Sequence, residues 1–286
     1  MTADSPDPTA PEGVSAHTLS AQDVHLGYRD RSIIEALDVE VPRSRITAIV
    51  GPNACGKSTL LRGLSRLLVP SAGHIMLDGR DIHSMPTRDV ATILSLLPQT
   101  PQAPEGITVA DLVGRGRYPH QGWFRKWTDA DDAIVEAAMA ATGIRDLASR
   151  SIDELSGGQR QRVWIAMALA QGTDMLLLDE PTTYLDITHQ IEVLDLLVDV
   201  NAAGTTVIMV LHDLNLASRY ADHIIAMKEG RIVAEGTPRE VITSRLVREV
   251  FDLESLVTSD PVSGSPTVAP IGRHHRPEAP QQGNAS

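Results

Sequence analysis

The sequence predicts an α/β fold in which buried strands end in polar, ligand-binding residues, and three segments carry this prediction. An apolar strand over residues 46–50 runs into a glycine-rich loop and then into a helical segment. A second apolar strand, over residues 175–178, ends in two carboxylates, and a third, over residues 206–211, ends in a histidine. Ligands bind at the carboxyl ends of the strands in open α/β sheets. We therefore expect a binding site where these segments end.

The glycine-rich loop has the spacing G-x-x-x-x-G-K-S of a phosphate-binding loop. In such a loop the backbone N–H groups and the positive end of the following helix hold a polyphosphate. Lys57 is expected to reach the β- and γ-phosphates, and Ser58 to place its hydroxyl on Mg²⁺. The sequence therefore predicts a bound nucleoside triphosphate with Mg²⁺. The loop consists of Gly51, Pro52, Asn53, Ala54, Cys55, Gly56, Lys57, Ser58 and Thr59.

The polar residues at the other strand ends suit the chemistry of that ligand. Asp179 suits Mg²⁺ coordination, and Glu180 suits orienting or deprotonating a water molecule. His212 could contact the same phosphate, although a lone histidine at a strand end is more often structural. Gln99 follows another apolar stretch, and on spacing alone it is an ordinary polar loop residue.

Ser156, Gly157 and Gly158 precede a second helical segment, over residues 163–170. A plain N-cap would explain the serine. Two exposed glycines at a helix start, however, cost backbone entropy without structural benefit. We interpret this segment as a second anion-binding helix terminus.

Composition excludes several classes of protein. With 37 acidic and 25 basic residues the net charge is -12, which argues against a protein that mainly grips nucleic-acid phosphates. Cys55 is the only cysteine, so the chain forms no internal disulfide and is expected in the cytosol. No apolar run approaches the roughly 20 residues of a membrane-spanning helix. Proline and small polar residues predict disordered tails over residues 1–16 and 257–286.

The aromatic residues leave two alternatives open. A tyrosine between two strands, Tyr28, is more often a packing residue, but it could stack on a base. A second group could form either a small core or an exposed patch for a partner. This group comprises Trp123, Phe124 and Trp127, beside Arg117, Arg125 and Lys126.

The order of these motifs makes the chain resemble an ATP-binding cassette (ABC) ATPase over about residues 19–256. The resemblance implies a P-loop NTPase with a RecA-like core, an antiparallel β subdomain and an α-helical subdomain over about residues 100–170. Residues 17–256 would form this ATPase domain. The resemblance further implies that residues 51–59 are the Walker A loop, Gln99 the Q-loop glutamine, Leu155 to Gln159 the signature, Met175 to Glu180 Walker B, Leu185-Asp186 the D-loop and His212 the switch histidine.

Roles follow from the same resemblance. The catalytic group would be Glu180, His212, Gln99 and Lys57, and the Mg²⁺ group Ser58, Gln99 and Asp179. Tyr28 falls at the position of the adenine-stacking aromatic residue, which favours stacking over packing. The nucleotide would also contact the loop residues 51–59 and, from a second subunit, Ser156, Gly157, Gly158, Gln159 and Asp186.

In this family the signature of one subunit caps the ATP held by another, so a chain with one set of motifs should form a homodimer. Residues 104–109, 114–120, 181–189 and 211–219 resemble the iron-siderophore importer branch. This implies that ATP hydrolysis powers uptake of a ferric siderophore through a separate membrane permease, fed by an extracytoplasmic binding protein. The chain would sit at the cytoplasmic face of the membrane and touch the permease through residues 100–127. An importer of cobalamin or haem, or a soluble ABC clamp on ribosomes or DNA, are the alternatives.

Three positions in and near the loop lead to further expectations. Ala54 stands where the family often has glycine, so its φ is expected to avoid positive values. Ser44 stands at a turn where glycine is common. Cys55 lies beside a helix N-terminus and Lys57, which favour the thiolate. A thiol alkylator is therefore expected to block ATP binding.

Overall fold

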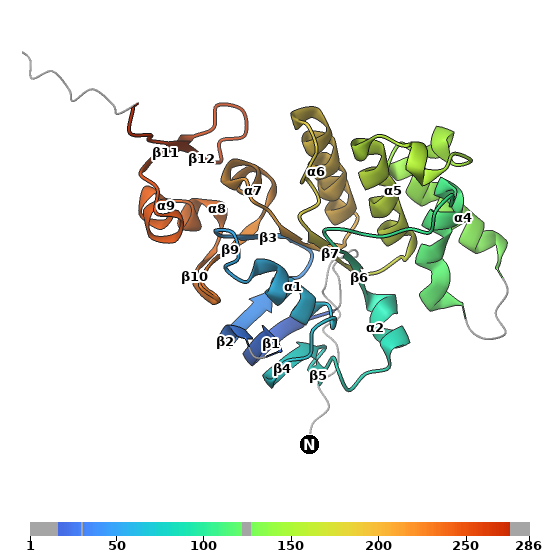
Figure 1. The fold of residues 1–286 in the computed structure, drawn as a ribbon, viewed down its shortest axis with the longest axis horizontal. Helices are drawn as coiled ribbons and strands as arrows, with labels where there is room; N and C mark the ends of the chain where they lie inside the picture. The colour runs from blue at the N-terminus through green and yellow to red at the C-terminus, as the bar shows by residue number, and fades with distance from the viewer. Residues whose placement is uncertain (1–16, 30, 122–126, 275–286) are drawn as a thin grey trace, which may run out of the picture.

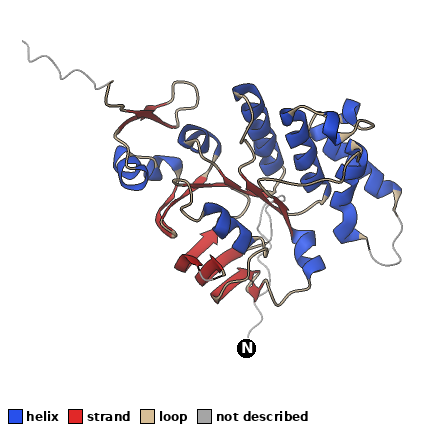
Figure 2. Ribbon diagram, in the orientation of Figure 1, coloured by secondary structure: helices blue, strands red, loops and turns tan. Residues whose placement is uncertain are grey.

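The computed structural model describes residues 17–29, 31–121 and 127–274. The tail predicted over residues 1–16 and the segment 122–126, with two of the clustered aromatic residues, lie outside this range. The chain forms two larger sheets and a helical region beside them (Figures 1 and 2). The described part contains no helix long and apolar enough to cross a membrane.

The antiparallel sheet has the strand order β2-β1-β4-β5. Its strands are β1 (Leu19–Tyr28), β2 (Arg31–Val41), β4 (Ala72–Leu77) and β5 (Arg80–Asp81). Alternate apolar side chains of these strands are buried on one face, as expected for a sheet with one solvated side. A tight hairpin joins β1 to β2 and pairs Tyr28 with Arg31.

The central sheet has the strand order β10-β9-β3-β8-β7-β6. All its neighbouring strands are parallel except β9 and β10. Three of its strands are buried at every residue, which explains their unbroken apolar sequences. The strands are β3 (Ile46–Val50), β6 (Leu94–Leu97), β7 (Met175–Asp179), β8 (Thr206–Val210), β9 (His223–Lys228) and β10 (Arg231–Gly236).

Helices cover this sheet and build the helical region (Figure 2). They are α1 (Lys57–Leu64), α2 (Thr87–Ile93), α3 (Val109–Gly114), α4 (Asp129–Ala141), α5 (Gly157–Ala170), α6 (Ile187–Ala202), α7 (Leu214–Tyr220), α8 (Pro238–Val241) and α9 (Ser244–Phe251), with 3-10 turns η1 (Arg115–His120), η2 (Arg145–Leu147) and η3 (Ile152–Glu154). Successive side chains of β3 enter different cores, Ala48 on one face of the sheet and Ile49 on the other. The predicted fold class is thereby confirmed.

The C-terminal segment corrects one expectation. Residues 255–270 form a hairpin of β11 (Ser255–Ser259) and β12 (Pro266–Pro270), so the prediction of disorder from residue 257 is wrong there. The side chain of Asn215 on α7 accepts from the N–H of Val268 at 2.7 Å and donates to its carbonyl at 3.3 Å. Arg219, also on α7, pairs with Asp260 at 2.6 Å. Composition could not reveal these contacts because their partners are distant in sequence.

Candidate active site

The phosphate loop joins β3 to α1 and folds around the side chain of Lys57. The Nζ atom of Lys57 donates to the carbonyl oxygens of Gly51 and Pro52, both at 2.9 Å, and the side chain is buried. Gly51 has φ +153°, and a Cβ there would lie 2.3 Å from the carbonyl oxygen of Met227. Glycine is therefore required at the start of the loop.

Ala54 and Ser44 both adopt the left-handed backbone conformation, with φ of +60° and +49°. The prediction that Ala54 avoids positive φ is wrong. The backbone next to Ala54 is held by hydrogen bonds of Cys55, whose carbonyl accepts from Gly230 N at 2.8 Å and whose N–H donates to the Pro52 carbonyl at 3.4 Å. Such a conformation costs a non-glycine residue roughly 1–2 kcal/mol, which the surrounding contacts offset.

Ser58 and Asp179 form a pair of oxygen donors beside the loop. The hydroxyl of Ser58 donates to Asp179 Oδ1 at 2.8 Å. Burial raises the pKa of Asp179, and the hydrogen bond from Ser58 acts in the opposite direction. Hydroxyl and carboxylate oxygens are ligands that Mg²⁺ prefers, usually together with water and phosphate oxygens. The donor set therefore fits Mg²⁺.

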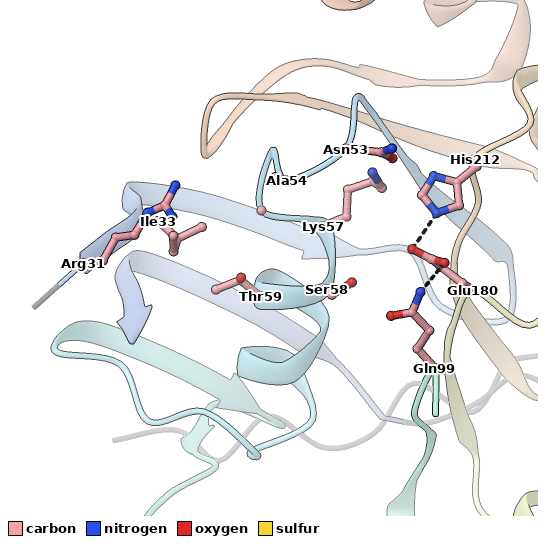
Figure 3. Close-up of a pocket in the computed structure, with 11 residues that line it drawn as sticks. Arg31, Ile33, Asn53, Ala54, Lys57, Ser58, Thr59, Gln99, Glu180 and His212 are labelled. Atoms are coloured by element: carbon pink, nitrogen blue, oxygen red, sulfur yellow. Dashed lines mark hydrogen bonds and ion pairs between the residues drawn. The ribbon is translucent and has the colours of Figure 1, made fainter. Parts of the chain in front are cut away.

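Three side chains hold Glu180, and two of them, Gln99 and His212, are drawn in Figure 3. The Nε2 atom of Gln99 lies 2.5 Å from its Oε2, and the hydroxyl of Thr183 donates to the same oxygen at 3.1 Å. His212 Nε2 lies 2.5 Å from Oε1. Glu180 itself has φ +56°, a strained value of the kind that clusters at functional sites. The side chains meet because β6, β7 and β8 are adjacent and parallel.

A cavity of about 450 Å³ lies over the loop and beside Glu180. The described residues that line it are Arg31, Ile33, Asn53, Ala54, Gly56, Lys57, Ser58, Thr59, Gln99, Glu180 and His212. Sequence reasoning missed Arg31 and Ile33, although both stand on the strand that pairs with Tyr28. Tyr28 is 42% exposed, and its hydroxyl accepts a hydrogen bond from Arg62 at 3.0 Å. It is absent from the described lining of the cavity.

The second predicted anion site lies at the start of α5. Ser156 caps this helix in a reciprocal pair, in which its hydroxyl accepts from Gln159 N at 3.3 Å and Gln159 Oε1 accepts from Ser156 N at 3.1 Å. Gly157 is exposed, but Gly158 is buried against the ring of His189. The expectation of two exposed glycines is therefore wrong for Gly158. Glycine suits this position because the ring of His189 fills the space that a side chain would need.

Asp186 stands at the start of α6. Its Oδ1 accepts from the backbone N–H of His189 at 2.9 Å and lies 2.7 Å from His189 Nδ1. These two hydrogen bonds lower the pKa of Asp186. The carboxylate thus has a structural role as the cap of α6.

Cys55 does not have the environment expected of a reactive thiolate. Its side chain is buried, and this burial raises the pKa of the thiol, with Lys57 opposing the shift. The expectation of a favoured thiolate is wrong, because desolvation outweighs the nearby positive charge.

The described part of residues 100–127, the stretch predicted to bind the permease, contains both buried and exposed side chains. Arg117 is buried and pairs with Asp131 at 3.0 Å, so it belongs to the interior. Trp127 is 43% exposed, and its Nε1 donates to Asp132 at 2.6 Å. Tyr118 is 58% exposed.

Comparison with known proteins identifies the family. The family model described as ABC transporter matches residues 34–183 of this chain. The chain belongs to the ABC transporter family. This ABC protein is 55% identical to the ATP-binding protein YusV of Bacillus subtilis (strain 168), over 91% of the chain and 94% of YusV. It is 52% identical to the ferric enterobactin transport ATP-binding protein FepC of Escherichia coli (strain K12), over 91% of the chain and 96% of FepC.

Among solved structures, this ABC protein resembles cbiO1 from Clostridium perfringens, part of the ABC transporter complex cbiONQ. The TM-score is 0.71 at 30% identity, over 81% of the chain and 92% of cbiO1. As an ABC ATPase, the chain binds a nucleotide and hydrolyses ATP in support of transport.

The predicted site residues of this ABC ATPase fall into two groups. The structure brings the first together at the strand ends and the phosphate loop: Lys57, Ser58, Gln99, Asp179, Glu180 and His212. The second group lies on α5 and α6 and is absent from the described lining of the cavity: Ser156, Gly157, Gly158, Gln159 and Asp186.

Proposed function

We propose that this chain is the ATP-hydrolysing subunit that powers import of a ferric siderophore through a separate membrane permease. The observation that carries the catalytic part is the carboxylate of Glu180, held between Gln99 and His212 beside the phosphate loop. The similarity to a ferric enterobactin transport protein along nearly the whole chain supports the substrate class.

Each group beside the loop has a role in phosphoryl transfer. Lys57 and the loop N–H groups hold the β- and γ-phosphates of ATP. Ser58, Asp179 and Gln99 would hold Mg²⁺, and the ion would supply positive charge that neutralises the phosphate oxygens. His212 contacts the γ-phosphate.

Glu180 orients the attacking water and accepts its proton. Both of its oxygens are already engaged, Oε1 by His212 and Oε2 by Gln99 and Thr183. A carboxylate oxygen can accept two hydrogen bonds, so Oε1, which has one partner among the described residues, can also accept the water. The contacts with His212, Gln99 and Thr183 keep the carboxylate in place, so that little reorganisation is needed during the reaction.

Two copies of the chain complete the site. Ser156 caps α5 and Gly157 is its first residue, and neither is among the described residues that line the chain's own cavity. We assign them to the γ-phosphate held by a second copy. Asp186 lies at the same interface. Tyr28 stacks on the adenine, since it pairs with the cavity-lining Arg31.

The permease contacts residues 100–127 at the cytoplasmic face of the membrane, where the chain is held peripherally. The exposed rings of Tyr118 and Trp127 suit such a contact, because aromatic side chains are frequent anchors at interfaces. An extracytoplasmic binding protein delivers the siderophore to the permease.

The test compares the wild type with Glu180→Gln, each alone and with the permease in membrane vesicles. We expect the variant to lose ATP hydrolysis and to accumulate as an ATP-bound dimer, detected by light scattering. Normal hydrolysis by the variant would refute the catalytic role. Uptake of radiolabelled ferric siderophore, cobalamin and haem by a deletion strain carrying this chain decides the substrate, and restored uptake of cobalamin or haem alone would refute siderophore import.

A further inference from the structure

The helices α5 and α6 lie side by side (Figure 1) and approach each other closely at their first turns. Gly158 lies in the first turn of α5 and His189 in the first turn of α6. A Cβ on Gly158 would lie 2.6 Å from Cδ2 and 3.1 Å from Nε2 of His189. Real Cβ atoms do not approach other atoms so closely. The ring of His189 therefore occupies the space that any other residue at position 158 would need.

The opposite edge of the same ring binds Asp186. His189 Nδ1 lies 2.7 Å from Asp186 Oδ1, which also accepts the backbone N–H of His189. One imidazole thus touches both the signature segment and the D-loop of the same chain. About one turn further along the two helices, Arg162 of α5 pairs with Glu192 of α6, a second side-chain contact between them.

The loop between β7 and α6 connects this contact to Glu180. Glu180 and Tyr184 both have positive φ in this loop, at +56° and +64°. Thr183 N donates to the Glu180 carbonyl at 3.2 Å, and the hydroxyl of Thr183 donates to the Glu180 carboxylate at 3.1 Å. These hydrogen bonds tie Glu180 to the loop that leads to Asp186.

We propose that His189 is a positioning residue that sets the place of the signature glycine Gly158 relative to Asp186. The signature start that caps the ATP of a second copy is then held by the same loop that carries Glu180 in its own chain. The proposal rests on the two-copy site described above. It assigns His189 no contact with ATP, so its effect is on assembly and turnover and leaves nucleotide affinity unchanged.

A double-mutant cycle tests this role. In the Glu180→Gln background, Gly158→Ala places a methyl group against the imidazole, and we expect it to weaken ATP-dependent dimerisation by about tenfold or more. Adding His189→Ala removes the obstructing ring but also the positioning contact, so the double variant should dimerise no more weakly than the weaker of the two single variants. Additive effects of the two substitutions would overturn the proposal.

Two variants serve as matched controls. A Cβ on Gly157 meets no atom of the described residues within 4 Å, so the effects of Gly157→Ala and His189→Ala on dimerisation should be additive. Equal non-additivity there would overturn the proposal. His74 forms a similar pair with Asp81, at 2.7 Å on the antiparallel sheet, and His74→Ala should leave dimerisation unchanged. If His74→Ala weakens dimerisation as much as His189→Ala, the loss is not specific to α6 and the proposal fails.

Two further measurements complete the test. The first distinguishes a positioning role of His189 from a merely structural one, and the second tests the contact between His189 and Gly158 even if the proposed function is wrong. His189→Ala, with Glu180 intact, should lower kcat for ATP hydrolysis about tenfold or more and leave KM for ATP within about twofold. Equal changes in both parameters would overturn the positioning role. The same cycle, measured by thermal unfolding without nucleotide, should show coupling between positions 158 and 189 even if ATP does not cause dimerisation. Absence of that coupling would refute the contact itself.

Discussion

His212 and Glu180, at the ends of the adjacent strands β8 and β7, are in direct contact, with Nε2 of the histidine 2.5 Å from Oε1 of the glutamate. The imidazole is 43% exposed and faces the cavity over the phosphate loop. The histidine is therefore placed to contact both a bound phosphate and Glu180, the residue proposed to activate water.

Replacing His212 with alanine should lower kcat for ATP hydrolysis by about 10²–10³-fold, because a donor to the developing charge is lost. Nucleotide affinity should change little, since Lys57 and the loop N–H groups remain. Single-turnover hydrolysis and binding of a fluorescent ATP analogue measure the two effects. A variant with wild-type kcat would contradict the role.

Replacing Asp179 with asparagine should raise the Mg²⁺ concentration needed for half-maximal ATPase activity by about tenfold or more. Asparagine keeps the size of the side chain but removes the negative charge beside Ser58. A titration of activity with Mg²⁺ at saturating ATP measures the shift. Ser58→Ala should raise the Mg²⁺ requirement as well, and Ser58→Thr, which retains a hydroxyl, is its matched control. An unchanged Mg²⁺ requirement in Asp179→Asn would contradict the assignment.

Tyr184 is 95% exposed, so packing within its own chain contributes little to stability, and its φ of +64° is a strained backbone conformation. Tyr184→Gly should leave thermal stability unchanged or raise it by roughly 0.5–1 kcal/mol, because glycine adopts this conformation freely. The same substitution should weaken ATP-dependent dimerisation, since the residue lies in the loop that precedes Asp186. Val262→Gly, which removes another exposed side chain at a distance from α6, is the control. Loss of stability together with unchanged dimerisation would contradict this prediction.

Cys55 should react slowly with thiol reagents in the folded protein. Its pKa is raised above the ordinary value by burial, so the thiolate fraction is small at neutral pH and increases only in alkaline solution. The rate of reaction with an aromatic disulfide reagent, compared between native and urea-unfolded protein, measures the effect. Equal rates in the two states would show that the thiol is accessible.

The C-terminal hairpin should depend on the ionised form of Asp260. Backbone N–H groups of Ser263 and Val262 and the Arg219 side chain hold the pKa of this carboxyl well below its usual range. Its contribution to stability is therefore complete above the unfolded pKa of about 4 and is lost as the pH falls through the lower folded value. Hydrogen exchange of residues 255–270 should show protection that persists at pH 5 and declines only in strong acid.

Asp260→Asn should weaken this protection at neutral pH and at pH 5, and its difference from the wild type should disappear in strong acid, where Asp260 is protonated. Asp199→Asn, at an exposed carboxylate on α6, should have no effect on the hairpin and is the control. Undiminished protection in Asp260→Asn would show that other contacts, such as that between Asn215 and Val268, are sufficient.

Much of the catalytic centre could be predicted because it depends on local patterns. The apolar strand, the glycine-rich loop and the helix that carries Lys57 are contiguous in the chain, and so are β7 and its terminal carboxylates. Unbroken apolar runs indicate buried parallel strands, whose carboxyl ends must meet at one edge. These rules place Ser58, Asp179 and Glu180 in one site without any knowledge of side-chain contacts, and the resemblance to the ABC family added His212.

Other features could not be predicted because their physical cause lies elsewhere in the chain. Burial by residues distant in sequence decides the pKa of Cys55. Contacts with α7 order the hairpin in a segment whose composition indicates disorder. Arg31 enters the cavity only because the hairpin at Tyr28 turns back toward the loop.

The sequence by itself determined the nucleotide-binding chemistry, since a phosphate loop and strand-end carboxylates act through residue type and spacing. Only the tertiary structure decided that Gly158 is a packing glycine, that its neighbour is His189, and that this histidine also binds Asp186. The reason is physical. The sequence shows that position 158 is glycine, but only the contact between α5 and α6 shows which side chain occupies the space beside it.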